Sequence, residues 1–257
     1  MALLELQKVS KFFGGLAAIS DLDMEVNDGE IVGLIGPNGA GKTTTFNVIT
    51  GELMPNAGRI IFEGRDISGL KPHEVAELGI VRTFQLVTLF PGYSVLENVL
   101  VGLHLQSDIG FVEAMFNTPS NRQRELNLLD QAMMILRFTG LLGVCDELAE
   151  NLPHGLQRTL GLAIGLAAKP RILLLDEPLT GMNPKETSEM IDTIRQIRDR
   201  YGTTIVVVEH NMRAVMTLCE RIVVINFGQK IAEGLPEEIR EDTAVIEAYL
   251  GREEDAS

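Results

Sequence analysis

The sequence predicts an α/β fold in which a parallel sheet follows an N-terminal antiparallel β layer and carries a helical insert. Three short, strongly apolar runs, typical of buried strands, lie at Ile31–Ile35, Ile172–Leu175 and Thr204–Val208. An amphipathic pattern from about Pro184 to Arg200 predicts a helix between the last two runs, and strand, helix and strand at this spacing imply parallel strands. Helical periodicity replaces strand signals between Ser94 and Leu152, which indicates the insert.

The N-terminal segment alternates between apolar and polar residues, as half-buried strands do. The apolar positions are Leu4, Leu6, Val9, Ile19, Leu22, Met24 and Val26. Turn residues at Gly14–Gly15 and Asn27–Gly29 end the two runs. We therefore expect two antiparallel strands that lead into the buried strand at Ile31–Ile35.

The insert and the C-terminal segment contain the remaining elements. In the insert, one helical face carries Val95, Val99 and Leu103, and another carries Leu126, Leu129, Met133 and Leu136. The stretch between these helices, Gly110–Arg122, contains turn residues and predicts a surface loop. Arg221–Ile225 and Lys230–Glu233 predict a hairpin. Glu237–Leu250 predicts a C-terminal helix.

The length and composition favour one domain with a subdomain. Of the 257 residues, 45% are hydrophobic and 23% charged, which is enough apolar surface for a sizeable core and excludes wholesale disorder. We expect a single domain over residues 1–257. Its α/β core and β layer would comprise residues 1–93 and 157–257, and the helical subdomain residues 94–156.

Charge and composition also bear on the partners of the chain. A net charge of −14 would repel nucleic-acid phosphates, so no DNA or RNA partner is expected. No apolar run approaches the roughly 18 residues that a membrane-spanning helix needs. Met1–Leu6 lacks the features of a secretory signal, so we expect a cytosolic protein. Cys145 and Cys219 are too few for a disulfide framework and are expected to be reduced.

The strongest motif is GPNGAGKTT, which follows the strand Ile31–Ile35 and precedes a helical pattern, as a phosphate-binding P-loop requires. It comprises Gly36, Pro37, Asn38, Gly39, Ala40, Gly41, Lys42, Thr43 and Thr44. Its glycines let backbone N–H groups turn inward as an anion-binding nest at a helix N-terminus. Lys42 would reach the β and γ phosphates of ATP, and the Thr43 hydroxyl would bind Mg²⁺. A dinucleotide-binding loop is the alternative, but Thr44 occupies the position of its third glycine.

Two acids, Asp176 and Glu177, end the strand that begins at Ile172. A purely structural pair is the alternative. Since a P-loop is expected one or two strands away, the pair instead predicts ATP hydrolysis. Asp176 is suited to hold hydrated Mg²⁺, and Glu177 to polarise the water that attacks the γ-phosphate.

His210 follows the strand Thr204–Val208 and Glu209. A lone histidine at a strand end is often a surface residue, which is the alternative here. Ligands bind at this edge of parallel sheets. His210 is therefore predicted to bridge the γ-phosphate and the neighbouring catalytic residues.

Together these motifs resemble those of ATP-binding cassette (ABC) proteins over nearly the whole chain. The resemblance implies the family's fold, a RecA-like P-loop core with an N-terminal antiparallel β layer and a helical subdomain. It implies that Gln85 is the Q-loop glutamine, which contacts Mg²⁺ and the attacking water. It places Phe13 where the family stacks an aromatic ring on adenine, with a core phenylalanine as the alternative. Leu179–Asn183 resembles the D-loop, with Asn183 in place of the usual aspartate.

Within the family, the chain resembles the ATPase subunits of branched-chain amino-acid importers of the LivG type. The segments that carry this resemblance are Val81–Gln85, Thr118–Ser120, Asn183–Thr187, Val208–Met212 and Ile246–Gly251. Urea-importer and lipopolysaccharide-exporter cassettes share part of the pattern. The resemblance implies that two subunits, identical or a cassette and its sister, sandwich two ATP molecules. It also implies membrane permease subunits, through which alone the chain would lie on the inner face of the cell membrane.

The family's signature, Leu-Ser-Gly-Gly-Gln, is degenerate in this chain. The corresponding residues are Leu152, Pro153, His154, Gly155 and Leu156, followed by Gln157. In the family this segment lies against the partner subunit's ATP. The serine hydroxyl and one glycine are absent here, and we expect the following helix to begin at Leu156.

Two functions remain as alternatives to a transport ATPase. A cassette ATPase acting on DNA or ribosomes would need basic patches, a coiled-coil or zinc insert, or a second cassette, and the sequence has none of these. A nucleotide-binding regulatory or structural subunit with low turnover is favoured only by the degenerate signature, because the P-loop lysine, the strand-end acids and His210 are all present.

Overall fold

The computed structural model describes residues 2–83, 89–104 and 119–250. The chain divides into two compact units. The first contains Met1–Arg82, Arg171–Leu179 and Ile194–Ser257, and the second contains Thr83–Pro170 and Thr180–Thr193. The segment 94–156, expected as a helical subdomain, falls within the second unit. No helix in the described part of the chain is long and apolar enough to cross a membrane.

The main sheet of the first unit has six strands in the order β10-β9-β3-β8-β7-β6. Their bounds are β3 (Ile31–Ile35), β6 (Ile80–Thr83), β7 (Ile172–Asp176), β8 (Thr204–Val208), β9 (Arg221–Asn226) and β10 (Gln229–Gly234). Strands β9, β3, β8 and β7 are parallel, and β10 pairs with β9 as an antiparallel hairpin. Every residue of β3, β7 and β8 is buried, as expected for a parallel sheet covered on both faces. The predicted parallel sheet and hairpin are therefore confirmed.

The second sheet of this unit is antiparallel, with the order β2-β1-β4-β5. Its strands are β1 (Ala2–Phe13), β2 (Leu16–Asn27), β4 (Ala57–Phe62) and β5 (Arg65–Asp66). The first two are the predicted alternating strands. Strands β4 and β5 were not predicted, because β4 has only one short apolar stretch, Ile60–Phe62, and β5 has two exposed charged residues. Segments this short do not show the alternation of apolar and polar residues by which a strand is predicted.

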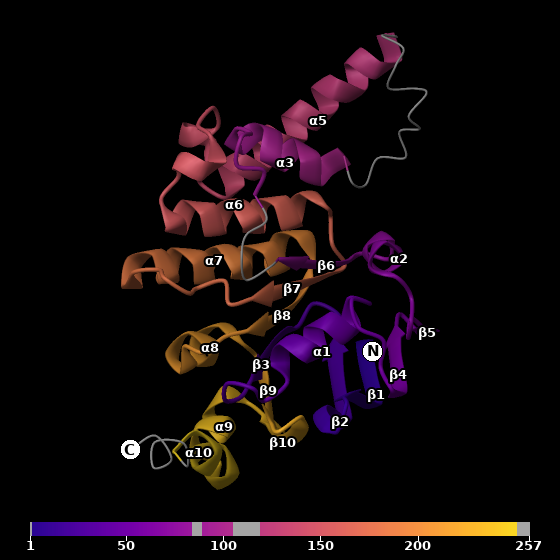
Figure 1. Ribbon diagram of the computed structural model, residues 1–257. Coiled ribbons are helices and arrows are strands. Elements are labelled where there is room, and N and C mark those ends of the chain that lie inside the picture. The colour runs from indigo at the N-terminus through magenta and orange to yellow at the C-terminus, as the bar shows by residue number, and fades with distance from the viewer. Residues whose placement is uncertain (1, 84–88, 105–118, 251–257) are drawn as a thin grey trace. The chain divides into compact units, whose positions relative to one another are not determined.

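The core of the first unit lies between its two sheets and includes α1 (Lys42–Ile49), as Figure 1 shows. Phe46 and Ile49 of α1 join one buried cluster with residues from β1 to β4 and from β7 to β9. The helix that follows the P-loop is thus fixed by apolar burial along its length. Its first turn lies beyond the carboxyl end of β3, where Thr43 is exposed and can meet a ligand.

The remaining helices of the first unit are α2 (Pro72–Glu77), α8 (Met212–Leu218), α9 (Pro236–Glu241) and α10 (Thr243–Leu250). The prediction that Glu237–Leu250 is helical is confirmed, although the structure divides the segment into α9 and α10 at Asp242. Asp242 has extended backbone angles, φ −71° and ψ 121°, and its Oδ1 accepts the Val245 N–H at 3.1 Å. An aspartate that caps a new helix in this way ends the preceding one.

The second unit contains α3 (Val95–His104), α5 (Pro119–Phe138), α6 (His154–Ala167), two single-turn helices and the first half of α7 (Pro184–Tyr201). The predicted face of α3 is confirmed, since its three apolar residues are buried. The predicted face of α5 is wrong in its first half, where Leu126 and Leu129 are exposed. Only the last turns of α5 are covered, and there Ala132 and Leu136 are buried.

The loop expected over Gly110–Arg122 is also corrected in part. Helix α5 begins at Pro119, so residues 119–122 are helical. Proline fits the first turn of a helix because its missing N–H has no partner there in any case. Residues 110–118 lie outside the described part of the chain.

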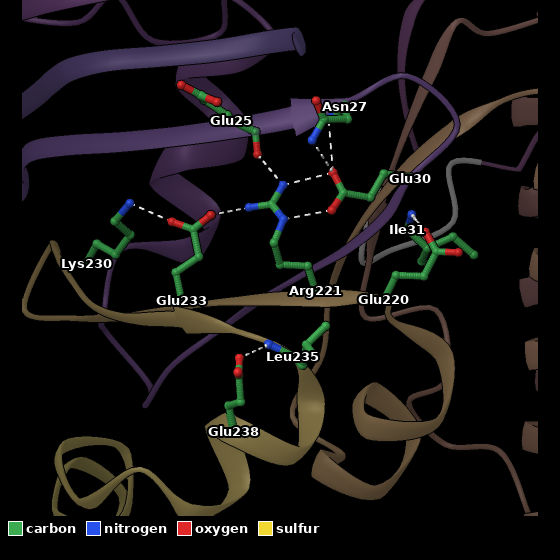
Figure 2. Close-up of polar contacts among 10 residues, drawn as sticks. All are labelled: Glu25, Asn27, Glu30, Ile31, Glu220, Arg221, Lys230, Glu233, Leu235 and Glu238. Atoms are coloured by element: carbon green, nitrogen blue, oxygen red, sulfur yellow. Dashed lines mark hydrogen bonds and ion pairs between the residues drawn. The ribbon is translucent and has the colours of Figure 1, made fainter. Parts of the chain in front are cut away.

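Arg221 ties the start of β9 to the segment that connects β2 and β3 (Figure 2). Its Nε and Nη2 donate to the two carboxylate oxygens of Glu30 at 2.7 and 2.8 Å, and Nη2 also donates to the Glu25 carbonyl at 2.7 Å. Its Nη1 contacts Glu233 of β10, which in turn accepts from Lys230. This cluster joins the edge of the main sheet to the antiparallel layer.

Candidate functional site

The P-loop runs from the end of β3 to the start of α1, and its glycines are required by close backbone packing. Gly36 has φ 155°, and a Cβ there would lie 2.0 Å from the Ile225 carbonyl oxygen. Gly41, the N-cap of α1, has φ 108°, and its Cβ would lie 2.4 Å from the Ala18 carbonyl oxygen. Only glycine fits either position. The ends of the loop are therefore pressed onto β9 and β2, while Asn38–Gly39 at its tip is exposed.

Lys42 and Thr43 occupy the first turn of α1. The Lys42 side chain folds back on the loop, where Nζ donates to the Gly36 carbonyl at 2.7 Å and the Pro37 carbonyl at 3.0 Å. Lys42 is buried, whereas Thr43 beside it is exposed and Thr44 half-buried. The first N–H groups of a helix have no intrahelical partner. An entering phosphate can thus take over the ammonium from the loop carbonyls and accept these N–H groups.

Strand β8 brings the P-loop strand and the acid-bearing strand to the same level. Its last residue, Val208, pairs with Leu34 of β3 on one side and with Asp176 of β7 on the other. The P-loop and the two strand-end acids therefore leave the same edge of the sheet, separated by one strand. This is the arrangement that the sequence predicted.

Glu177 turns away from the strand that carries Asp176. Its backbone lies in the left-handed region at φ 51°, and its N–H donates to the Val208 carbonyl at 2.8 Å. For a non-glycine residue that conformation costs about 1 to 3 kcal/mol and is typical of functional sites. Its Oε1 contacts His210 Nε2, so the structure brings together the two residues predicted to act at the γ-phosphate. The His210 side chain is 44% exposed and the Glu177 side chain 12%.

Glu209 holds the loops that carry these two residues, and the sequence analysis did not identify it. Its carboxylate accepts the Leu179 N–H at 2.7 Å and the N–H of His210 at 3.1 Å. Burial raises the pKa of Glu209, backbone hydrogen bonds oppose that rise, and the nearby Glu177 charge adds to it. An acid directly after a buried strand was the available signal, as it was for Asp176.

Arg82 is the second residue that the sequence analysis missed. Its Nη2 lies 2.6 Å from Asp176 Oδ2, and its Nη1 lies 2.6 Å from Asn47 Oδ1 on α1. The side chains of Arg82 and Asp176 are 7% and 1% exposed. The proposed metal-binding acid is thus half of a buried ion pair.

The residues present fit a magnesium ion held jointly with phosphates. Asp176 Oδ1 is buried and has no hydrogen-bond partner among the described residues, so it can accept from a metal-bound water. The described ranges contain no group of three or more histidine, cysteine or acidic side chains that could hold a metal alone. Mg²⁺ commonly keeps several waters and binds through one or two protein groups plus substrate phosphates. Thr43 and Asp176 match that pattern.

Phe13 lies at the end of β1 and is 47% exposed. The alternative of a core phenylalanine is therefore wrong, and the ring is accessible for stacking. The Lys11 ammonium lies 5.4 Å from the centre of this ring. Gln85, the predicted Q-loop glutamine, lies outside the described residues.

Tyr249 of α10 reaches the P-loop from the C-terminal end of the chain. Burial raises the pKa of the Tyr249 phenol, and a hydrogen bond from the Gly36 backbone partly offsets this rise. Tyr249 lies in the segment Ile246–Gly251, which contributes to the family resemblance. Its contact with the first glycine of the loop was not foreseen.

The signature segment lies in the second unit. Helix α6 begins at His154, two residues before the predicted start, because Pro153 has the extended backbone of an N-cap. Gly155 is therefore in the first turn, where its N–H has no intrahelical partner. A Cβ at Gly155 would lie 3.0 Å from the Glu186 carboxylate. Gln157 turns back to donate to the Leu152 carbonyl at 2.9 Å.

The D-loop-like segment ends in a capped helix start, also in the second unit. Asn183 Oδ1 accepts the N–H groups of Lys185 and Glu186, each at 3.0 Å, and Glu186 accepts the Asn183 N–H at 2.9 Å. This reciprocal pair satisfies the first N–H groups of α7. Asparagine can cap the helix as well as aspartate does.

Comparisons with known proteins agree with this geometry. A family model described as ABC transporter matches residues 19–180, and one described as branched-chain amino acid ATP-binding cassette transporter matches residues 229–255. The chain is 45% identical to the high-affinity branched-chain amino acid transport ATP-binding protein LivG of Salmonella typhimurium, over 93% of this chain and 94% of that protein. It is 34% identical to the lipopolysaccharide export system ATP-binding protein LptB of Haemophilus influenzae, over 98% and 99%.

A solved ATP-binding cassette of an ABC transporter, in its ADP conformation, is 30% identical with a TM-score of 0.84, over 98% of this chain and 99% of that chain. The ABC transporter model spans more than half of the chain, and the curated relatives cover nearly all of it. The P-loop and the strand-end acids lie at one edge of the sheet, and His210 contacts Glu177 there. The chain therefore belongs to the ABC transporter family, as an ATP-hydrolysing cassette subunit.

Proposed function

We propose that the chain binds ATP with Mg²⁺ at its P-loop, hydrolyses it, and so energises the import of branched-chain amino acids through membrane permease subunits. The observation that carries the catalytic part is the contact between Glu177 and His210 at the sheet edge where the P-loop begins. A general base and a group that orients it are what in-line attack of water on a γ-phosphate requires.

Each residue of the site has a distinct role in this proposal. Lys42 and the loop N–H groups hold the β and γ phosphates. Thr43 and Asp176, with Gln85 as the family resemblance implies, would hold Mg²⁺, which neutralises charge on the phosphates when bound. Glu177 accepts a proton from the attacking water, and His210 orients its carboxylate.

Phe13 completes the nucleotide site by stacking on adenine. Its exposed ring supports this role, and so does the lysine beside it, because a cation above one face leaves the other face for the base.

The proposed cargo rests on the relatives. The relatives that are 45% and 36% identical to the chain carry names for branched-chain amino acid transport. The family model that matches residues 229–255 also names a branched-chain amino acid transporter. A lipopolysaccharide-export relative matches at 34% identity. Import of branched-chain amino acids is therefore favoured over lipopolysaccharide export and over urea import.

The proposed assembly is a pair of cassettes attached to permease subunits on the inner face of the membrane. Each α6 N-terminus, with the N–H of Gly155, would complete the partner's ATP site. A helix N-terminus favours phosphate whatever its side chains are. Pro153, His154, Leu156 and Gln157 would shape this surface.

Reconstitution tests the proposal. The chain would be assembled in proteoliposomes with the permease and binding-protein subunits that co-purify with it, and phosphate release and uptake of labelled leucine or urea would be measured. Release stimulated by leucine supports the proposal. Stimulation by urea would overturn the cargo alone. Absence of phosphate release would favour a regulatory subunit with low turnover.

A further inference from the structure

Arg82 joins two parts of the proposed magnesium site that are otherwise separate. It lies on β6, with one guanidinium nitrogen bonded to Asp176 at the end of β7 and another bonded to Asn47 on α1. Helix α1 also carries Lys42 and Thr43. The same guanidinium lies 5.6 Å from the centre of the Phe46 ring and 3.5 Å from Glu52. Its position is therefore fixed from several sides.

The two oxygens of Asp176 are used unequally. Oδ2 receives the guanidinium at 2.6 Å, whereas the buried Oδ1 has no hydrogen-bond partner among the described residues. Leaving a buried carboxylate oxygen unpaired is costly, unless a ligand completes it. The contact at Oδ2 restrains rotation of the carboxylate about its Cβ–Cγ bond and so favours one direction for Oδ1.

A purely structural ion pair explains these contacts less well. A buried ion pair stabilises the fold only when further hydrogen bonds satisfy its remaining lone pairs, and even then it gains little over well-packed apolar residues. Arg82 instead bonds to only one oxygen of Asp176, and its other terminal nitrogen bonds to Asn47 on α1. That division is suited to a residue that orients a metal-binding acid.

We propose that Arg82 is a positioning residue that holds Asp176 Oδ2 and α1 together, so that Oδ1 points at the coordination shell of the magnesium ion. This inference rests on the proposed role of Asp176. Partners that orient metal-binding side chains typically contribute about 10- to 100-fold to metal affinity. Arg82 itself touches neither the nucleotide nor the ion.

Nucleotide binding with and without Mg²⁺ tests this role. The probe is AMP-PNP, a non-hydrolysable ATP analogue, titrated into the purified chain by calorimetry with excess Mg²⁺ or with excess EDTA. For Arg82→Met we expect unchanged affinity in EDTA, within about twofold, and about a tenfold or larger loss of affinity in Mg²⁺. Arg82→Lys, which keeps the charge, should recover part of that loss.

Matched variants separate the outcomes. Glu233→Gln removes an acid that pairs with a different arginine, Arg221, and should leave both affinities unchanged. Equal losses in Mg²⁺ and EDTA would overturn the proposal in favour of a structural role, and no loss in either would overturn it as well. Higher affinity of Arg82→Met in Mg²⁺ would also overturn the proposal, because Arg82 would then compete with the ion. If Arg82→Met does not fold, Asn47→Ala and Arg82→Lys are measured in its place. If both of these variants bind AMP-PNP as tightly as the parent in Mg²⁺, the proposal is overturned.

Asp176→Asn distinguishes the inference from the function on which it rests. It should abolish the gain in affinity that Mg²⁺ confers. If it retains that gain, the proposed metal role of Asp176 is wrong. If it loses the gain while Arg82→Met retains it, only the role of Arg82 is wrong.

Discussion

Two arginines in the first unit hold acidic side chains but leave them in different states. Arg221 fills both oxygens of Glu30, and Glu30 accepts the Asn27 N–H as well (Figure 2). Arg82 fills one oxygen of Asp176, and the other, buried oxygen has no hydrogen-bond partner within the described ranges. Both oxygens of Glu30 thus accept hydrogen bonds from the protein, whereas Oδ1 of Asp176 is open to a ligand in our proposal. Saturation of the carboxylate, more than its burial or its partner, distinguishes a structural pair from a functional one.

Matched changes of an acid in each region should give the largest difference. Glu177→Gln removes the proposed base, and turnover should fall by at least the 10² to 10⁴-fold typical of losing a general base, while ATP still binds. Glu233→Gln makes the same chemical change beside Arg221 and should leave turnover within about twofold. Steady-state phosphate release measures both. Parental turnover in Glu177→Gln would remove the distinction between the two regions.

Removing the arginine of the saturated cluster should affect stability and spare activity. Arg221→Met should lower the free energy of unfolding by about 1 to 3 kcal/mol at neutral pH, because it deletes several hydrogen bonds to charged groups. Denaturant unfolding measures the change. Unchanged stability, or lost Mg²⁺-dependent nucleotide affinity in this variant, would contradict a purely structural role.

The effect of Arg221→Met should also depend on pH. Burial by itself would raise the pKa of Glu30, but the hydrogen bond from Arg221, helped by Asn27, lowers it below the ordinary value of 4.5. A carboxylate with a lowered pKa contributes stability above its unfolded pKa and loses it as the pH falls through the folded pKa. The stability difference between the parent and Arg221→Met should therefore be full at neutral pH and shrink below about 4.5. A difference that grows on acidification would contradict this assignment.

The smallest expected effect concerns the signature segment of the second unit. Pro153→Ser with His154→Gly restores the family's residues and should raise phosphate release several-fold, since it returns a hydrogen-bond donor for a charged phosphate. Gly155→Asp is the control and should abolish activity, because a side chain there would meet Glu186 and repel phosphate. If the double variant is no faster while the control is inactive, the segment already closes the site in its present form.

The sequence was sufficient for the parts of the fold that local patterns determine. Strands β3, β7 and β8 are continuous apolar runs, and the P-loop has its residues in one unbroken stretch, so both were predicted. Contacts between distant segments were not. Arg82 meets Asp176 across 94 positions, and Tyr249 meets Gly36 from the other end of the chain. Periodicity also could not show where the covered stripe of α5 ends, because that depends on the helices packed against it.

The central claim is that this chain hydrolyses ATP at a site completed by Mg²⁺, and phosphate release from the purified protein tests it most directly. The account predicts release in excess Mg²⁺ that stops in excess EDTA. It should stop in Lys42→Ala as well, because that variant lacks the ammonium that would move from the loop carbonyls to the phosphate. Release that persists undiminished in EDTA or in Lys42→Ala would contradict it.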